Sequence, residues 1–180
     1  GRELLHDRLA ADALQLKPFV DDMAASGIER VPGTAIFLTP DPEAVPHALL
    51  HSIKHFKTLH EQVVILSVSV FDVPYVPDID RIEVRRLAGN FAQVVVQYGY
   101  KDEPDIPAAL ALCTEAGLPI EMMDASFFLG RETLIPKLKS DMAYWRELLF
   151  VAMFRNAGSA TAYFRIPSNR VVELGAQIVL

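Results

Sequence analysis

Residues 35–66 read AIFLTPDPEAVPHALLHSIKHFKTLHEQVVIL and hold two apolar runs on either side of a helical pattern. The runs AIFL at 35–38 and VVIL at 63–66 are continuous, which is typical of strands buried on both faces of a sheet. Between them, apolar residues recur every three or four positions and predict a helix over residues 43–57. A strand, a helix and a second strand at this spacing form a βαβ unit, so we expect the two strands to be parallel.

The rest of the chain adds strands and helices around this unit. Residues 82–87 and 91–98 are rich in β-branched side chains and flank a short turn with Gly89 and Asn90, which predicts an antiparallel hairpin. Asp105 is the predicted N-cap of a helix that stops near Gly117. The remaining predicted elements are a strand at 125–129, a helix at 141–157, a turn of helix at 168–174 and a strand at 176–180. These elements predict an α/β domain with a mixed β-sheet, in which a parallel βαβ core and an antiparallel hairpin are flanked by helices.

The first 28 residues have a different pattern. Leu5, Leu9 and Leu16 belong to an apolar stripe at helical spacing, and charged residues occupy the other face of the predicted helix at 3–25. We therefore expect an amphipathic connector helix over residues 1–28, followed by a cytoplasmic α/β domain over residues 30–180. The chain begins at Gly1 rather than at a methionine, so we expect it to be part of a longer protein.

Composition narrows the classes of function. The chain has 180 residues, of which 51% are hydrophobic, and a formal net charge of −6 with no basic run, which argues against nucleic-acid binding. The single cysteine, Cys113, cannot form an internal disulfide and indicates a reducing compartment. The longest strongly apolar uncharged run covers residues 62–71, about half of the roughly 20 residues that a membrane-spanning helix needs.

A ligand site is predicted where the parallel strands end, because α/β sheets hold ligands in the crevice at the carboxyl ends of their strands. Thr39 and Asp41 follow the first strand and are candidate ligand-binding residues. Their loop, TPDP, is unlike a phosphate-binding loop, because two prolines remove N–H donors and Asp41 repels phosphate. A small ligand remains an open alternative at this position.

Two further candidates come from charged and imidazole side chains. His47, His51 and His55 lie four residues apart, so they share one face of the predicted helix. Two histidines four residues apart can chelate zinc, but the sequence offers no clear third ligand. We therefore predict no metal site and retain His51 only as a candidate ligand-binding residue. Arg131 follows the 125–129 strand, where it could bind an anion or form an ion pair with a neighbour. No catalytic residue and no cofactor are predicted, and an enzyme built on the histidine face is the least favoured alternative.

A series of motifs carries a resemblance that no single motif provides. In chain order they are RVPGTA at 30–35, PHALLH at 46–51, KH at 54–55, LHE at 59–61, VPYV at 73–76, YGY at 98–100, SFFLGRETLI at 126–135, Arg155-Asn156-Ala157, IP at 166–167 and NRVVELG at 169–175. From residue 30 to residue 180 the chain resembles the cytoplasmic C-terminal region of the KUP/HAK/KT potassium-uptake permeases.

The resemblance implies a parent protein that imports potassium together with protons through membrane helices. The carboxylates that coordinate the ion would lie in those helices, so this chain would carry no residue of the transport pathway. The resemblance therefore implies a regulatory or assembly domain of a potassium:proton symporter, placed at the cytoplasmic face of the inner membrane and joined to the membrane domain of the same permease within a homodimer. The alternative is a nucleotide-sensing module that binds cyclic di-AMP or an adenine nucleotide and gates potassium uptake.

Overall fold

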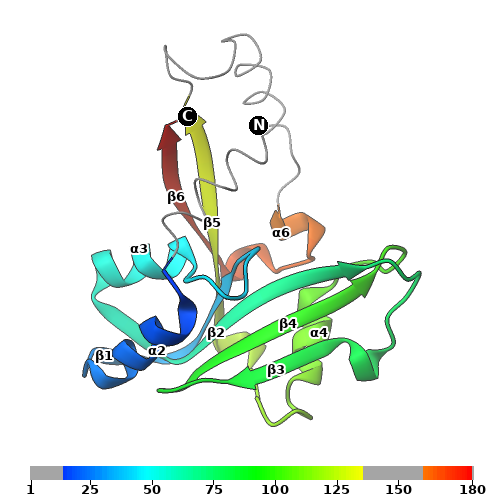
Figure 1. Ribbon diagram of the computed structural model, residues 1–180, viewed down its shortest axis with the longest axis horizontal. Helices are drawn as coiled ribbons and strands as arrows, with labels where there is room; N and C mark the ends of the chain where they lie inside the picture. The colour runs from blue at the N-terminus through cyan, green and yellow to red at the C-terminus, as the bar shows by residue number, and fades with distance from the viewer. Residues whose placement is uncertain (1–13, 136–159, 180) are drawn as a thin grey trace.

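The computed structural model describes residues 14–135 and 160–179, and the side chains of residues 14–130 and 160–175. Its six strands form a sheet with the order β3-β4-β2-β1-β5-β6 (Figure 1). Their bounds are β1 Glu29–Leu38, β2 Thr58–Phe71, β3 Ile82–Arg86, β4 Phe91–Gly99, β5 Ala125–Ile135 and β6 Val171–Val179. Neighbouring strands are parallel except for β3 and β4, which are antiparallel. The predicted mixed sheet with a parallel core and a hairpin is confirmed.

The centre of the sheet is the βαβ unit that the apolar runs predicted. Strand β1 lies between β2 and β5, so that Phe37 has Ile65 on one side and Phe128 on the other. Residues 35–37 and 63–66 are fully or almost fully buried. Both strands begin several residues before these runs, because β1 and β2 already pair from Glu29 and Thr58 onward.

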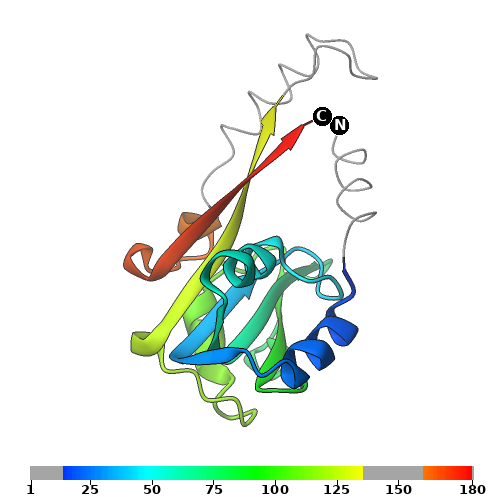
Figure 2. The same cartoon turned by 90° about the vertical axis from the view of Figure 1, so that its left-hand side faces the viewer.

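Helices cover both faces of the sheet (Figure 2). Helices α2 (Leu16–Ala25) and α3 (His47–Phe56) pack on one face, where the rings of Phe37 and Phe128 stack at 4.7 Å between centroids. Helix α4 (Ile106–Leu112) packs on the other face, against Ile36, Val64 and their neighbours. Successive strand residues alternate between the two faces, so this central sheet contributes to two apolar layers at once.

Helix α2 begins at Leu16 rather than inside one continuous helix at 3–25, because Gln15 is extended and forms a bridge with Ala44. Residues 3–13 of the predicted helix lie outside the described residues. Its Leu16 and Val20 are buried in the same apolar layer as α3. Backbone bonds also join the two segments, since Leu16 N donates to the carbonyl of Glu43 at 2.8 Å. The division of the chain into a connector and a domain at residue 28 stays a prediction.

Several element boundaries differ from the prediction. Helix α4 ends at Leu112 rather than near Gly117, and β5 continues to Ile135 rather than ending at residue 129. Helix α3 begins at His47 rather than at residue 43, because the backbone just before it pairs with the segment that leads into α2. The helical turn predicted at 168–174 is limited to the 3₁₀ turn η3 (Ser168–Arg170). Residues 171–174 belong instead to β6, because they pair with β5 from Phe127 onward. The helix predicted at 141–157 lies outside the described residues.

The remaining short helices are η1 (Asp78–Asp80), η2 (Met122–Asp124) and α6 (Ala160–Tyr163). Asp105 caps α4 as predicted, since its carboxylate accepts a bond from Ala108 N at 2.9 Å. Among the residues that the structure describes, no helix has the length and apolar character needed to cross a bilayer.

Candidate docking site at the end of strands β2 and β4

Two segments that are distant in the sequence meet where β2 and β4 end. Tyr100 N donates to the carbonyl oxygen of Val73 at 2.9 Å, and Lys101 N donates to that of Pro74 at the same distance. Gly99 makes this approach feasible, because a Cβ atom there would stand 2.5 Å from both carbonyl oxygens. Any larger residue would force the two segments apart. The loop after β2 is thereby folded back onto the end of β4.

An ion pair between Arg81 and Asp102 holds the same loop. The Asp102 carboxylate accepts bonds from Arg81 Nη1 at 2.8 Å, from Gly99 N at 2.7 Å and from Val76 N at 3.0 Å. The two charged side chains are only 13% and 11% exposed. These donors, the Arg81 guanidinium first and the two backbone N–H groups next, lower the pKa of Asp102 from 3.8 to about 2. Asp102 therefore links the residue before β3, the last residue of β4 and the loop. We call this ion pair the Arg81–Asp102 joint.

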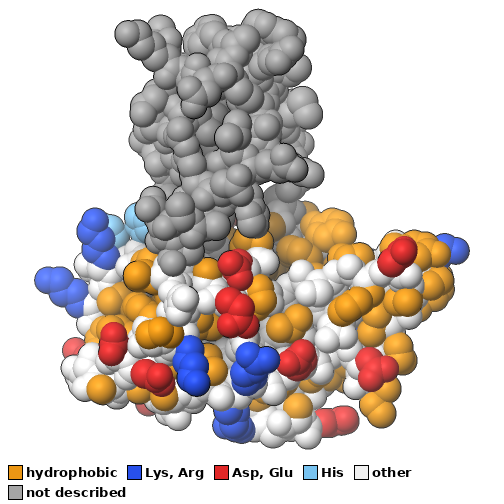
Figure 3. Space-filling view, viewed as in Figure 1, with side chains coloured by type: hydrophobic (Ala, Val, Ile, Leu, Met, Phe, Trp, Pro, Cys, Tyr) orange, Lys and Arg blue, Asp and Glu red, His pale blue; other side chains and the backbone are white. Residues whose placement is uncertain are grey.

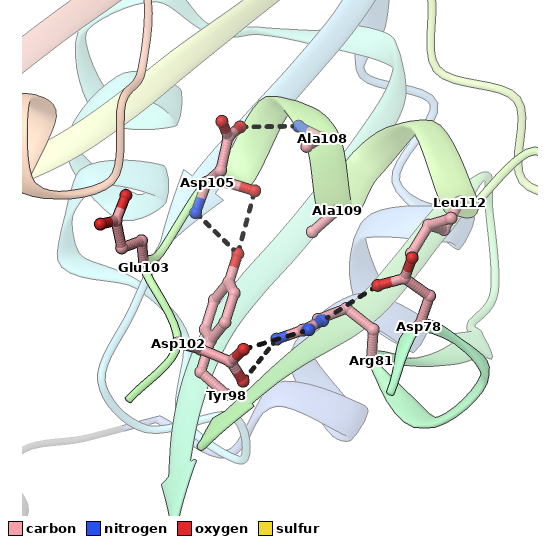
Figure 4. A pocket seen from close by; sticks show the side chains of 9 residues that line it. All are labelled: Asp78, Arg81, Tyr98, Asp102, Glu103, Asp105, Ala108, Ala109 and Leu112. Carbon is pink, nitrogen blue, oxygen red and sulfur yellow. Dashed lines mark hydrogen bonds and ion pairs between the residues drawn. The ribbon is translucent and has the colours of Figure 1, made fainter. Parts of the chain in front are cut away.

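Arg81 has further partners around this joint (Figure 4). Its guanidinium lies 4.9 Å from the centre of the Tyr98 ring and donates to the carbonyl oxygens of Val76 and Gln97. The Tyr98 hydroxyl donates to the carbonyl of Asp105 at 2.9 Å and accepts from its N–H at 3.0 Å. Burial raises the pKa of Tyr98. The start of α4 is thus connected to the same network as the loop.

A cavity of about 190 Å³ adjoins this network. Arg81, Tyr98 and Ala109 line it, together with the acidic side chains of Asp102 and Glu103 among others. Since Arg81 is engaged by Asp102, the charge that faces the cavity is chiefly negative. This arrangement disfavours phosphate groups and offers no acid–base pair of clear catalytic geometry.

The outer surface of the braced loop is apolar. Five large side chains there are between 42% and 64% exposed, and we call them the apolar tip: Val70, Phe71, Val73, Tyr75 and Tyr100. Hydrophobic side chains gather over this end of the sheet at the right of Figure 3. A group of exposed aromatic and branched side chains on a rigid support is characteristic of a surface that contacts another protein or a membrane. The apolar tip is therefore a candidate docking surface.

Comparison with known proteins identifies the setting of this surface. Residues 32–180 match the family described as "K+ potassium transporter C-terminal domain". The chain belongs to this family of potassium transporter C-terminal domains. Over all 180 residues it is 81% identical to "Probable potassium transport system protein Kup 3" and 64% identical to "Probable potassium transport system protein Kup 1", both of Dechloromonas aromatica (strain RCB), and 54% identical to "Probable potassium transport system protein Kup" of Azoarcus sp. (strain BH72).

The chain covers 29%, 29% and 28% of the lengths of these three relatives. It therefore spans less than a third of the curated proteins that it matches. No solved structure matches the chain. The resemblance to potassium-uptake permeases is confirmed.

Two of the predicted ligand-binding residues of this transporter domain lie together after β1. Thr39 Oγ1 donates to the carbonyl oxygen of Asp41 at 3.0 Å and accepts from Asp41 N at 3.2 Å. Asp41 Oδ1 accepts from Glu43 N at 2.9 Å. Both side chains therefore close their own loop, and neither lines the cavity beside Tyr98.

The other two predicted residues lie elsewhere. His51 is half-buried on α3, with its ring 5.8 Å from that of His55. Arg131 belongs to β5 opposite Gly175, and its side chain lies outside the described part of the structure. A second cavity of about 300 Å³, lined by Gln62, Arg86 and others, contains none of the four. Ligand binding by these residues stays a prediction.

The apolar tip and the Arg81–Asp102 joint are absent from the residues that sequence reasoning selected. A signal was present, because VPYV at 73–76 and YGY at 98–100 were among the motifs that carried the family resemblance. Nothing in the sequence places these two motifs side by side, since their contact depends on a loop reversal after β2. Asp102 lies in the acidic segment KDEPD at 101–105, whose composition is typical of a solvated loop, yet its carboxylate is largely buried.

Proposed function

We propose that this domain is a regulatory and assembly part of a potassium:proton symporter, docked through its apolar tip on the membrane-spanning remainder of the same transporter. The domain would lie at the cytoplasmic face of the inner membrane, within a homodimer. Support comes from the family match and from relatives that are named as potassium transport proteins and are more than three times as long as this chain. The observation that carries the proposal is the braced apolar tip.

The form of the tip favours a protein partner of this kind. The loop that presents it is held by backbone bonds to Tyr100 and Lys101 and by the Arg81–Asp102 ion pair. Apolar side chains on a surface that is already ordered lose little conformational entropy when a partner covers them. The tip is therefore prepared for docking without a rearrangement of the domain.

Charge argues against a direct contact with lipid headgroups. Asp72 lies within the tip segment and is exposed, and Asp78 and Asp80 follow in η1. Lys101 is the exposed basic residue next to Tyr100. An excess of acidic side chains repels the anionic lipids of a cytoplasmic leaflet, so we favour a protein surface as the occupant.

The test is a pair of substitutions in the full-length transporter. Tyr75→Ser and Tyr100→Ser truncate exposed side chains, so the domain should fold normally, and we expect slower potassium uptake by cells that depend on this transporter. Phe56→Ser is the matched control, because Phe56 is 58% exposed at the end of α3, outside the tip. Equal uptake by the wild type and both tip variants would contradict the proposal.

A direct readout of contact completes this test. We expect a thiol introduced by Tyr75→Cys to react more slowly with a water-soluble maleimide than one introduced by Phe56→Cys, both in full-length transporter in membranes. The two parent side chains are similarly exposed in the domain, at 64% and 58%. Equal labelling rates would show that the tip is uncovered in the transporter.

Nucleotide sensing is the alternative function, with cyclic di-AMP or an adenine nucleotide as the ligand. The loop at 39–43 offers little to a phosphate, because Asp41 already accepts the bond from Glu43 N and adds a negative charge. We therefore propose docking as the principal role. Calorimetry of the domain with cyclic di-AMP, ATP and AMP separates the two, since measurable heat would establish a nucleotide site that docking does not require.

A further inference from the structure

Strand β3 ends the sheet on one side, and its outer edge faces away from β4 (Figure 1). Gln97 N donates to the carbonyl of Arg81, and Leu87 N donates to that of Phe91. In an antiparallel pair, residues that bond to the neighbour alternate with residues that do not. The odd-numbered residues of β3 therefore bond to β4, and the N–H and C=O groups of Ile82, Val84 and Arg86 point outward.

The side chains of β3 add a charge pattern to this edge. Glu83 and Arg85 project from one face of the sheet, and their side chains are 56% and 58% exposed. Arg85 Nη2 lies 3.5 Å from Glu83 Oε1. Val84 lies between them on the opposite face, where it packs beside the apolar layer under α4. The edge thus presents a negative charge, a central valine and a positive charge in sequence.

We infer that this edge pairs with the same edge of a second copy of the chain, antiparallel about a two-fold axis at Val84. In that register Val84 faces Val84 of the second copy, and the outward N–H and C=O groups of residues 82, 84 and 86 bond across the axis. Glu83 then stands opposite Arg85 of the second copy, at a position without backbone bonds, where facing side chains are closest. Two sheets become one continuous sheet.

Charge selects this register over its neighbours. With Val84 on the axis, the four charged side chains alternate in sign around a rectangle, so each one has two neighbours of opposite charge. A shift of two residues in one direction places Glu83 opposite Glu83, and a shift in the other places Arg85 opposite Arg85. Like charges directly opposite each other destabilise a strand pair. A shift of one residue breaks the match between outward backbone groups.

Edge strands often carry charges that prevent pairing, and β3 differs from such an edge in one respect. A protective edge repels a second copy of itself when its charges have one sign. Glu83 and Arg85 have opposite signs and exchange places under the two-fold axis, so the edge attracts its own copy. Glu43, 3.9 Å from Arg85, adds an acidic side chain on the same face.

This pairing rests on the proposed function in one respect. A five-residue edge is small compared with the 1,200–2,000 Å² of a typical stable interface, so we expect it to be weak in the free domain. In a homodimeric transporter the membrane parts hold two domains at high effective concentration, which makes a weak contact sufficient. The test therefore uses the full-length transporter in membranes.

The reporter is Val84→Cys, the position that faces itself across the axis. Facing residues of a bonded antiparallel pair have Cα atoms about 5.5 Å apart, within the range that a disulfide spans. We expect copper phenanthroline to join two Val84→Cys chains rapidly. The parent protein, whose Cys113 is buried, sets the background. Cross-linking no faster than this background would overturn the inference.

Charge-reversal variants test whether the cross-linking depends on the proposed pairing of Glu83 with Arg85. In the Val84→Cys background, Glu83→Arg makes both edge charges positive and Arg85→Glu makes both negative, so each should cross-link to itself at least tenfold more slowly. Co-expression of these two variants should restore cross-linking between unlike chains, because every facing pair then has opposite charges. Neither variant regains the ion pair within its own strand, so restoration cannot come from that pair. Glu121→Arg, an exposed acid outside β3, is the control.

The outcomes separate this inference from the proposed function. Cross-linking that follows the charge pattern, together with normal uptake by the tip variants, would support the edge pairing and contradict docking through the tip. Slow uptake by the tip variants, together with unchanged cross-linking after either charge reversal, would support docking and overturn the edge pairing. Failure of the mixed pair to restore cross-linking also overturns it.

Discussion

Two loops at the carboxyl ends of the parallel strands are closed in different ways. The loop after β1 is closed by its own residues, because Thr39 bonds to Asp41 and Asp41 bonds to Glu43. The loop after β2 is closed by Asp102, which follows β4 and accepts from Val76 N 26 residues away, and by Arg81 just before β3, which donates to the carbonyl oxygen of Val76. The first closure is local and exposed, whereas the second is non-local and largely buried. Loss of the second should therefore have the larger consequences.

The largest effect is expected from Gly99→Ala. The new Cβ atom would meet two carbonyl oxygens at 2.5 Å, and since these are backbone atoms they cannot rotate away. We expect a loss of about 3 kcal/mol in the free energy of unfolding, measured by urea denaturation. Gly130→Ala is the control, because nothing lies within 4 Å of a Cβ atom at that position. Equal losses for the two variants would contradict the close approach.

The next effect concerns the acid sensitivity of the second loop. The pKa of Asp102 is lowered from 3.8 to about 2 in the folded domain, so its charged form stabilises the fold at any pH above 3.8. This contribution is lost as the pH falls through about 2. We expect Asp102→Asn to unfold more easily than the parent at pH 7, with the difference shrinking between about pH 4 and pH 2.

Thermal unfolding followed over this pH range provides the measurement. Asp21→Asn, which changes an exposed carboxylate on α2, should show no such convergence with the parent. A constant difference between Asp102→Asn and the parent at every pH would mean that the Asp102 charge does not hold the loop.

A smaller effect is expected at the first loop. Asp41→Ala removes the acceptor for Glu43 N, but this N–H is near the surface and can bond to water instead. We expect a loss of about 0.5 kcal/mol in the free energy of unfolding. Urea denaturation of Asp41→Ala and Gly99→Ala under the same conditions compares the loss in free energy of unfolding at the two loops. A loss as large as that of Gly99→Ala would remove the distinction between local and non-local closure.

The smallest effect on stability is expected at the apolar tip itself. Tyr75 is 64% exposed, so Tyr75→Ser should change the free energy of unfolding by less than about 0.5 kcal/mol. The same substitution is expected to slow potassium uptake, so stability and function should separate at this position. A destabilised Tyr75→Ser domain would mean that the ring supports the fold rather than a partner contact.

The parts of the fold that sequence predicted correctly depend on neighbours in the chain. The apolar runs at 35–38 and 63–66 indicate burial on both faces, Gly89 and Asn90 adopt the positive φ angles of a tight hairpin turn, and Asp105 caps α4. Each of these patterns is complete within a few residues. The parallel arrangement of β1 and β2 follows from them with the handedness and length of the connection.

The parts that sequence missed depend on pairing with distant residues. Val171 and the residues after it are strand because β5 is beside them, although their local pattern predicted a helical turn. Asp102 lies in a segment whose composition is typical of a solvated loop, but Arg81 and two backbone N–H groups surround its carboxylate. The apolar tip was missed for the same reason, since exposure of Tyr75 and Tyr100 is a property of the folded loop.

The position of β1 between β2 and β5 also has a consequence for synthesis on the ribosome. Its first partner, β2, follows directly after α3, but its second partner is β5, which pairs with it only from Ala125 onward. About 90 residues separate β1 from β5, so at translation rates of about 5–20 residues per second the buried edge of β1 waits about 5–20 seconds for its neighbour. During that interval the nascent domain exposes an unpaired strand edge made of Ala35, Ile36 and Phe37, which is a template for pairing with other chains unless a chaperone covers it.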